Sequence, residues 1–296
     1  MIDVQRLRIL RAVAEHGSFN QAARALLLTP SAVSQHIASL ERSLGHPVAV
    51  RSTRGVTLTE PGRLLVEAAE TISAELDQVR HEISRLTAER PVLTIATFTS
   101  GGRRLLPAAL ARFVAAHPEV ELTVREAEPE TAVPMVRSGG ADLALTYHFD
   151  GPLPLRAGLD WTPLMDDPLW LVLPREHRFA GRASLGLAEL AADRWVLGCL
   201  KTEAFLHRYA GLAAFDLQVA ASTTDYFFAQ SLVAAGVGVS LVPHVSLAPE
   251  ASDSVAVVRV EPPRPARHIG VVTPRRRRPQ PYTEALTAAL AEAVER

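Results

Sequence analysis

Hydrophobic residues recur along the first 45 positions with the spacing of short amphipathic helices. Asp3 can cap a first helix that ends near Gly17, and the capping box S-F-N-Q opens a second helix over Ser18–Leu26. Thr29-Pro30 is a typical start for a third helix, which ends at Gly45. Two helices separated by a tight turn form a helix-turn-helix.

The third helix has an apolar face and a polar face. Val33, Ile37 and Leu40 fall on one narrow stripe, which must face a core. The opposite face carries short, polar or cationic side chains and almost no acid, namely Ser31, Ser34, Gln35, Ala38 and Arg42. Such side chains can bond base edges or phosphates in a DNA major groove. A merely solvated helix face is the alternative.

Residues 48–58, VAVRSTRGVTL, alternate apolar and polar positions on both sides of a turn that contains Gly55. This pattern predicts a β-hairpin, or wing, beside the third helix. Arg51 and Arg54 lie at its tip, where they can bind phosphates or enter the minor groove. A solvated hairpin turn is the alternative.

A single long helix is predicted from residue 61 to residue 89, because the only glycine is Gly62 and no further proline occurs before Arg90-Pro91. Its apolar positions are spaced alternately four and three residues apart, at Leu65, Ala69, Ile72, Leu76, Val79, Ile83 and Leu86. This heptad seam predicts a homodimer, and packing against the same chain is the alternative.

Short apolar strands alternate with helical segments from residue 92 to the end, which predicts α/β lobes with largely parallel sheets. One helix is expected from about Ser100 to Ala116 and another over Thr131–Ser138. Ligands in such folds bind where the strands end and the helices begin.

Hydroxyl-rich junctions of this kind occur at residues 97–102, 199–202 and 222–225, and Thr146 ends another strand. Lys201, the only lysine, could pair with a carboxylate, which favours a small polar or carboxylate ligand. Ordinary helix capping and a surface lysine are the alternatives.

Composition and charge indicate a globular protein with a basic N-terminal part. Hydrophobic residues make up 48% and charged residues 21% of the 296 residues. Residues 1–65 carry eight arginines and four acids, a net charge of +4, which leaves −5 for the remainder of a chain whose total is −1. This asymmetry is typical of a DNA-binding module joined to another domain.

The sequence favours a cytoplasmic protein without a membrane segment, because the N-terminus lacks the pattern of a signal peptide and no apolar run approaches about 20 residues. The single cysteine, Cys199, excludes an intramolecular disulfide and a cysteine-rich zinc site; it is interpreted as a buried thiol, with a redox or nucleophilic role as the alternative. The run Arg275–Arg278 could bind DNA or an acidic partner, or be a solvated charge run.

An enzyme is not expected. The ten histidines are scattered, and H-E-x-x-H, G-x-S-x-G and phosphate-loop motifs are absent from the sequence. Neither a metal nor a cofactor is therefore predicted. A solute-binding protein is a further alternative, against which the helix-turn-helix argues.

Residues 5–62 resemble the N-terminal signature of LysR-type transcriptional regulators, through G-S-F-x-x-A-A, S-A-V-S-Q-x-I, L-E-x-x-L-G and R-x-x-R-G-V-x-L-T-x-x-G. The resemblance implies that bases are approached by Thr29, Pro30, Ser31, Ser34 and Gln35, and the DNA backbone by Arg51 and Arg54. It also implies paired long helices, dimers that pair again into tetramers, an interrupted inverted-repeat operator and RNA polymerase as a partner. Val48-Ala49-Val50 departs from the family, which usually has a bulky aromatic residue here.

The fragments LLPAALARFVAAHPEVEL, SGGADLALTY and LVAAGVGVSLVP resemble the LysR effector domain, which is built like periplasmic binding proteins. The resemblance implies an inducer cleft lined by Thr99, Ser100, Lys201, Thr202 and Thr224, with Thr146 as a weaker candidate. Pro134 is expected to interrupt the helix before G-x-D-L-A. The predicted domains are residues 1–59 for DNA binding, 60–90 for dimerisation and 91–296 for the effector, with lobes at 91–160 plus 268–296 and at 161–267.

Overall fold

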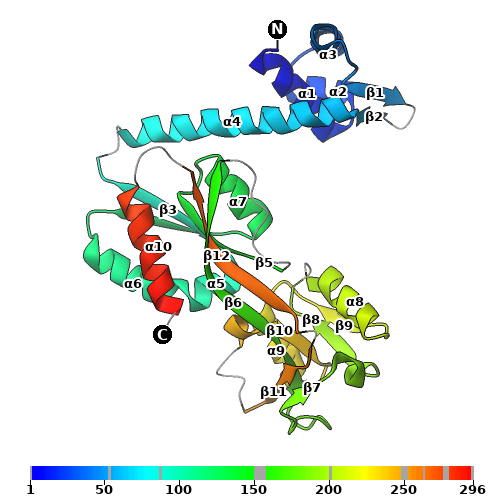
Figure 1. Ribbon diagram of the computed structural model, residues 1–296, viewed down its shortest axis with the longest axis vertical. Coiled ribbons are helices and arrows are strands. Elements are labelled where there is room, and N and C mark those ends of the chain that lie inside the picture. The colour runs from blue at the N-terminus through cyan, green and yellow to red at the C-terminus, as the bar shows by residue number, and fades with distance from the viewer. Residues whose placement is uncertain are drawn as a thin grey trace. The chain divides into compact units, whose positions relative to one another are not determined.

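The computed structural model divides into two compact units, Met1–Thr87 and Ala88–Arg296 (Figure 1). The structure describes residues 2–52, 55–86, 89–149, 158–199, 202–247, 253–262, 264–275 and 280–294. The N-terminal unit is helical with one β-hairpin, and the C-terminal unit is α/β. The predicted multidomain architecture is confirmed at this level.

Three short helices pack around one apolar core in the N-terminal unit. They are α1 (Val4–His16), α2 (Phe19–Ala25) and α3 (Pro30–Leu44). Asp3, Ser18 and Thr29 each accept a hydrogen bond from a backbone N–H in the first turn of the helix that follows. Gly17 and Gly45 end α1 and α3 with φ values of 60° and 73°, the left-handed region that favours glycine. The predicted starts and ends of α1 and α3 are confirmed.

The turn between α2 and α3 contains a strained leucine. Leu27 has a φ of 56° and is 93% exposed. Its backbone N–H donates to the Arg24 carbonyl, and the next residue donates to the Ala23 carbonyl, which closes the turn. A leucine is held in the left-handed region here by the geometry of the turn rather than by packing of its side chain.

The predicted wing is an antiparallel hairpin of β1 (Ala49–Ser52) and β2 (Gly55–Leu58). The following helix, α4 (Glu60–Leu86), has 27 residues and is therefore about 40 Å long. Its first turns pack on the core of the unit, whereas Leu76, Val79 and Ile83 are 52%, 49% and 57% exposed. The predicted seam thus begins in the core and continues as an exposed apolar stripe.

The first lobe of the C-terminal unit is a mixed sheet covered on both faces. Its order is β4-β3-β5-β12-β6, with β3, β4 and β5 parallel and β12 antiparallel to β5 and β6. One face packs on α6 and α10 and the other on α7. The elements are β3 (Val92–Thr97), α5 (Thr99–Arg104), α6 (Leu106–Ala116), β4 (Glu121–Glu126), α7 (Pro129–Arg137), β5 (Leu143–His148) and α10 (Pro281–Val294).

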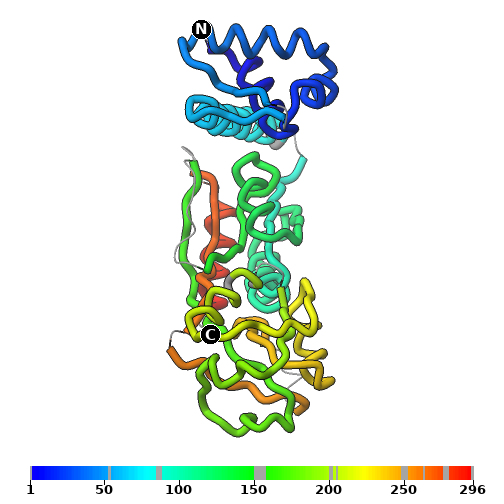
Figure 2. Tube along the Cα trace, turned by 90° about the vertical axis from the view of Figure 1, so that its right-hand side faces the viewer, coloured from blue at the N-terminus to red at the C-terminus, as the bar shows by residue number. Residues whose placement is uncertain are grey.

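Two long strands, β6 (Leu159–Pro174) and β12 (Ala266–Pro274), connect the first lobe to the second. The first half of β6 pairs with β12, and residues 169–174 pair with β10 or β11. Figure 2 shows the two lobes from the side. The second lobe adds β7 (Ser184–Leu185), η1 (Leu187–Leu190), β8 (Arg194–Leu197), α8 (Thr202–Leu212), β9 (Gln218–Ser222), α9 (Tyr226–Ala234), β10 (Ser240–Pro243), η2 (His244–Ser246) and β11 (Val255–Val260).

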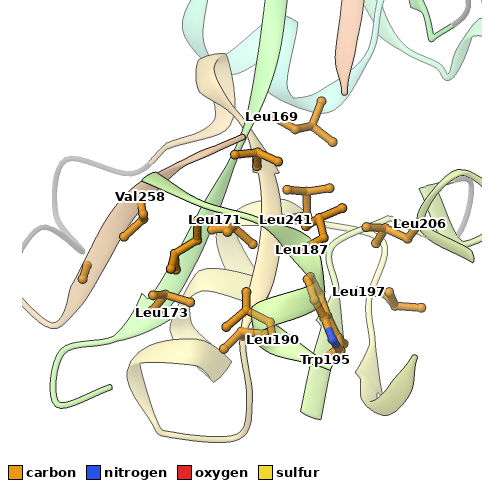
Figure 3. Close-up of a cluster of buried hydrophobic side chains, with 14 residues drawn as sticks. Leu169, Leu171, Leu173, Leu187, Leu190, Trp195, Leu197, Leu206, Leu241 and Val258 are labelled. Atoms are coloured by element: carbon orange, nitrogen blue, oxygen red, sulfur yellow. The ribbon is translucent and has the colours of Figure 1, made fainter. Parts of the chain in front are cut away.

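The core of the second lobe is a cluster of leucines around one tryptophan (Figure 3). Leu171, Leu173 and Leu190 are fully buried, and Trp195 stacks on Phe215 at a ring separation of 6.4 Å. A fully buried large apolar side chain contributes roughly 1.5–3 kcal/mol. This cluster therefore fixes β6 and β8 relative to each other.

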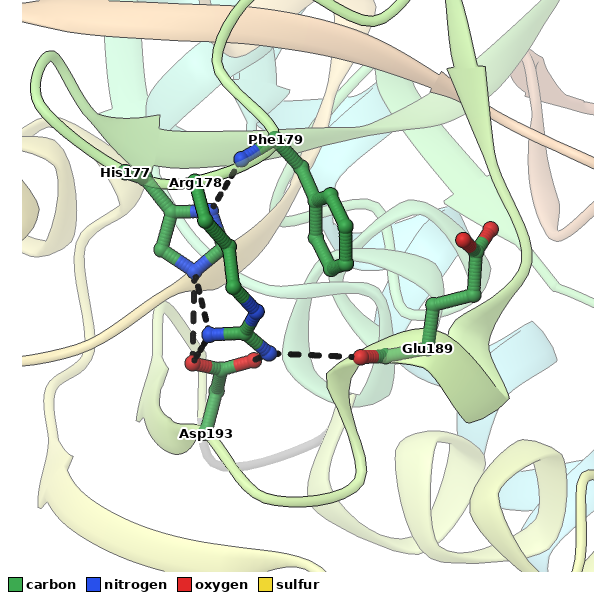
Figure 4. A network of polar contacts seen from close by, with 5 residues as sticks. All are labelled: His177, Arg178, Phe179, Glu189 and Asp193. Carbon is green, nitrogen blue, oxygen red and sulfur yellow. Dashed lines mark hydrogen bonds and ion pairs between the residues drawn. The ribbon is translucent and has the colours of Figure 1, made fainter.

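A polar network ties the segment after β6 to the loop before β8 (Figure 4). Arg178 donates two hydrogen bonds to Asp193, of 2.8 and 2.6 Å, and one to the Glu189 carbonyl. His177 Nε2 lies 3.2 Å from Asp193 Oδ1, while its Nδ1 accepts from the Phe179 N–H. Nε2 therefore carries the hydrogen and donates to Asp193.

Three predictions for the C-terminal unit were wrong. The sheets are mixed rather than largely parallel, because β12 runs antiparallel to both of its neighbours. The helix predicted from Ser100 to Ala116 is two helices that meet at Leu105, since Pro107 is tolerated only in the first turn of α6. Pro134 does not interrupt α7, which continues through it with Ala132 and Val136 fully buried on either side.

Candidate DNA-binding and effector sites

The outer face of α3 is exposed as the sequence predicted. Val33, Ile37 and Leu40 are buried, whereas Ser31 and Gln35 are exposed. Ala38 and Arg42 continue the exposed face toward the end of the helix. Thr29 Oγ1 lies 3.0 Å from Ser31 Oγ and accepts from the Ala32 N–H, so the helix start is fixed by the same hydroxyls that were predicted to approach DNA.

The hairpin lies beside this face. Arg51 donates from Nη2 to Ser34 Oγ at 2.8 Å, and its guanidinium carbon is 3.8 Å from the centre of the Phe19 ring. The other predicted wing cation, Arg54, lies outside the described residues. The structure therefore brings together a polar helix face and one stacked guanidinium, an arrangement suited to the grooves and phosphates of DNA.

A cavity of about 10 Å³ lies between the two lobes of the C-terminal unit. This volume holds about one water molecule. The lining comes from both lobes and from β12, and consists of Phe98, Thr99, Ser100, Glu128, Tyr147, Cys199, Thr224, Asp225, Tyr226 and Arg267. Protein atoms therefore nearly fill the space between the lobes at this point.

The side chain of Arg267 lines that space. Arg267 is 1% exposed and donates to Asp167 Oδ2 from Nε at 3.0 Å and from Nη2 at 2.6 Å. Nη2 also donates to Ser100 Oγ at 3.2 Å. Desolvation opposes the charged form, but Asp167, 0% exposed, raises the pKa of Arg267 above its ordinary value. The pair joins the two crossing strands, because Arg267 and Asp167 are directly opposite in the register of β12 and β6.

Aromatic rings surround this ion pair. The guanidinium carbon of Arg267 lies 5.2, 4.6 and 5.8 Å from the ring centres of Phe98, Tyr147 and Tyr226. Tyr147 donates to Glu128 Oε2 at 2.8 Å, and burial raises the pKa of Tyr147. Cation–π contacts and a buried ion pair together favour a closed arrangement of the two lobes.

The predicted effector residues are only partly brought together. Thr99, Ser100 and Thr224 line the cavity. Thr146 does not, because the neighbouring Tyr147 takes the cavity side of β5 and successive side chains point to opposite faces of a strand. The hydroxyl of Thr146 is buried and has no hydrogen-bond partner in the described part of the chain. Lys201 and the side chain of Thr202 lie outside the described residues.

The sequence did not reveal Arg267, and Phe98 and Tyr147 were only neighbours of the residues proposed to contact the effector. Asp167 and Arg267 are 100 positions apart, so no local pattern connects them. The described residues contain no group of three potential metal ligands, and none of their helices is long and apolar enough to cross a membrane.

Two family models together cover almost the whole chain. Residues 4–63 match the model described as "Bacterial regulatory helix-turn-helix protein, lysR family", and residues 87–295 match "LysR substrate binding domain". The chain belongs to the LysR family of bacterial transcription regulators. It is a DNA-binding transcriptional regulator with an effector-binding domain, and LysR-type regulators form oligomers and bind small-molecule effectors. The predicted family and function are confirmed.

Similar proteins include several LysR regulators. The chain is 28% identical to the "DNA-binding transcriptional dual regulator OxyR" of Escherichia coli, which covers 98% of this chain and 96% of the relative. It is 31% identical to a "Probable hydrogen peroxide-inducible genes activator" of Streptomyces viridosporus, over 98% of this chain and 93% of the relative. A "putative LysR family transcriptional regulator" structure from Pseudomonas aeruginosa superposes with a TM-score of 0.60 at 22% identity, over 100% of both chains, which shows the fold alone.

Proposed function

We propose that this LysR regulator binds its operator with α3 in the major groove and the β1–β2 hairpin against the DNA backbone. The exposed, almost acid-free face of α3, with a guanidinium held beside it, is the observation that carries the proposal. The proposed contacts are Thr29, Pro30, Ser31, Ser34, Gln35, Arg42, Arg51 and Arg54. The protein would act on DNA in the cytoplasm, with RNA polymerase as a partner and without an enzymatic step.

The dimer proposed for this function forms through α4. Leu76, Val79 and Ile83 leave an apolar stripe exposed, and a groove of about 430 Å³ between α1 and α4 continues it past Leu7 and Ile72. A second copy of α4 would cover this surface in a coiled-coil manner. A two-fold dimer matches an interrupted inverted repeat, and two such dimers would make the tetramer.

The effector proposed for the C-terminal unit is a small polar molecule, such as a carboxylate, that binds between the lobes. Ser100 and Arg267 place a hydroxyl and a buried cation at the cavity. These groups favour a ligand that carries a hydrogen-bond acceptor such as a carboxylate. A cavity of about 10 Å³ is too small for a metabolite, so binding would require the lobes to move apart. Lobe opening would then be the step that the effector controls.

The peroxide response in the names of several relatives is not proposed for this chain. Cys199 lines the cavity and is 8% exposed, but it is the only cysteine of the 296 residues. An intramolecular disulfide is therefore impossible within this sequence.

The operator is tested by footprinting the purified full-length protein on the DNA upstream of its own gene at two salt concentrations. Protection of an interrupted inverted repeat, weaker at the higher salt, is the expected result. If neither this DNA nor a genome-wide selection yields a preferred site, the proposed operator contacts are wrong.

A further inference from the structure

One guanidinium links three elements of the DNA-binding unit. Arg51, on β1, stacks on the ring of Phe19 in α2 at 3.8 Å and donates to Ser34 Oγ of α3 at 2.8 Å. Phe19 is 9% exposed and belongs to the core of the unit, so its ring is a fixed platform. A planar guanidinium can stack on a ring while its edge donors keep their direction. Arg51 is thereby held at a defined place beside the recognition helix.

The bond from Arg51 determines what the Ser34 hydroxyl can do next. A serine hydroxyl has one hydrogen to donate and lone pairs to accept with, whereas a guanidinium only donates. Ser34 Oγ must therefore be the acceptor, and its own hydrogen remains available. Within the described residues Ser34 makes no other hydrogen bond, and its side chain is half-buried at the edge of the exposed face of α3.

We propose that Arg51 is a positioning residue that holds Ser34 as a hydrogen-bond donor toward the bases, an inference that rests on the proposed placement of α3 in the major groove. A serine without a fixed partner can read either a donor or an acceptor. Ser34 already accepts from a charged donor through one lone pair, and its hydrogen has no partner among the residues that the structure describes, so this hydroxyl favours an acceptor atom on the base.

This assignment predicts the chemistry of one operator position. Guanine presents N7 and O6 as acceptors in the major groove, adenine presents N7, and thymine presents O4. Cytosine presents an amino donor and no acceptor there. The base opposite Ser34 is therefore expected to be any base except cytosine, and Arg51 sets this choice without touching the base.

The test is a selection of preferred duplexes from a random library, followed by affinity measurements on duplexes that differ at the position concerned. The proteins are full-length wild type, Ser34→Ala, Arg51→Met, Arg51→Lys and the double variant Ser34→Ala/Arg51→Met. Methionine keeps a contact with the Phe19 ring but cannot donate. Ser34→Ala changes a helix-surface position to the best helix former, so it keeps the fold.

Wild type is expected to disfavour cytosine at one position by roughly fivefold or more. Ser34→Ala and Arg51→Met should each reduce that preference to about twofold or less, and the double variant should show no further loss, because the two residues act as one unit. Arg51→Lys should recover part of the preference, since an ammonium also donates to Ser34.

Arg42→Met is the matched control, since it removes the same charge from the exposed face of α3 and has no contact with Ser34. It should weaken all duplexes equally and lower the salt dependence. If Arg51→Met behaves in the same way and still disfavours cytosine, Arg51 is only a phosphate contact and the inference is overturned. A wild-type protein that selects no sequence would instead overturn the placement of α3 itself.

Discussion

Removing the charge of Asp167 isolates the contribution of the buried ion pair between β6 and β12. Asp167→Asn keeps an oxygen that can accept from the Val245 N–H, as Asp167 Oδ1 does at 2.9 Å, but leaves Arg267 without its counter-charge. Both side chains are at most 1% exposed, so water cannot replace the carboxylate. Breaking such a pair from one side costs about 3–5 kcal/mol. For a unit of this size that corresponds to a decrease in Tm of about 6–20 °C.

The assay is thermal and denaturant unfolding of the full-length protein, with the transition of the C-terminal unit followed separately because the chain has two units. The double change Asp167→Leu/Arg267→Met is the control. It removes both charges and fills the space with apolar atoms, so it should lower the free energy of unfolding far less than Asp167→Asn alone. If Asp167→Asn lowers the free energy of unfolding by less than about 1 kcal/mol, Asp167 does not compensate the buried charge of Arg267. The account of the closed cavity would then be wrong.

Three further changes test other parts of the structure. Leu76→Glu with Val79→Glu should convert the dimer to a monomer in sedimentation, because unpaired carboxylates would be buried in the α4 interface. Leu27→Gly should raise the free energy of unfolding by about 1 kcal/mol, since glycine relieves the left-handed strain and the exposed side chain loses no packing. Asp193→Asn should destabilise the protein by about 1–2 kcal/mol at neutral pH, because the amide can accept only one of the two hydrogen bonds from Arg178 and carries no charge.

The pH dependence of the last change has a definite sign. Burial acts to raise the pKa of Asp193, but the hydrogen bonds from Arg178 and His177 hold it below its ordinary value. The stabilisation is therefore present above the pKa of the unfolded chain and disappears as the pH falls through the lower value of the folded chain. Wild type and Asp193→Asn should converge in acid; a constant difference down to about pH 2 would contradict this.

Controls separate these effects from general damage. Ser84→Glu adds a charge to α4 on the side away from the stripe and should leave the dimer intact; dimers that persist in the Leu76/Val79 variant would place the interface elsewhere. Leu27→Ala shortens the same side chain but keeps a Cβ atom and therefore the backbone strain. If it stabilised the protein as much as Leu27→Gly, relief of the left-handed strain would not be the cause.

The elements whose signals are local could be predicted from the sequence. Each cap of the N-terminal helices accepts from a backbone N–H three residues further along the chain, so neighbouring residues decide it. The break before α6 was also local, and Pro107 could have revealed it. The length of β6 could not be recognised in the same way, because Pro163 and Pro168 resemble strand ends. In the structure Pro163 lies opposite the register shift at Gly270, where prolines are tolerated in a strand.

The surroundings of the predicted effector site depend on long-range strand pairing, which the sequence could not reveal. The direction of β12 and its position between β5 and β6 depend on partners about 100 residues away, as does the meeting of Arg267 with Asp167. Thr146 was only a weaker candidate, and its neighbour Tyr147 lines the cavity; the sequence could not decide between them, because a strand alternates its faces and the sequence of β5 is apolar on both.

The two crossing strands also define how the C-terminal unit is threaded. The chain leaves the first lobe only along β6 and returns only along β12, among the residues that the structure describes. The second lobe is therefore topologically an insertion whose entrance and exit are hydrogen-bonded neighbours. Among the described residues this two-stranded ribbon is the covalent connection between the lobes, which also touch around Arg267. Ribbons of two strands are more strongly twisted than wide sheets. The lobe opening proposed for the effector would then be accompanied by a change in the twist of this ribbon.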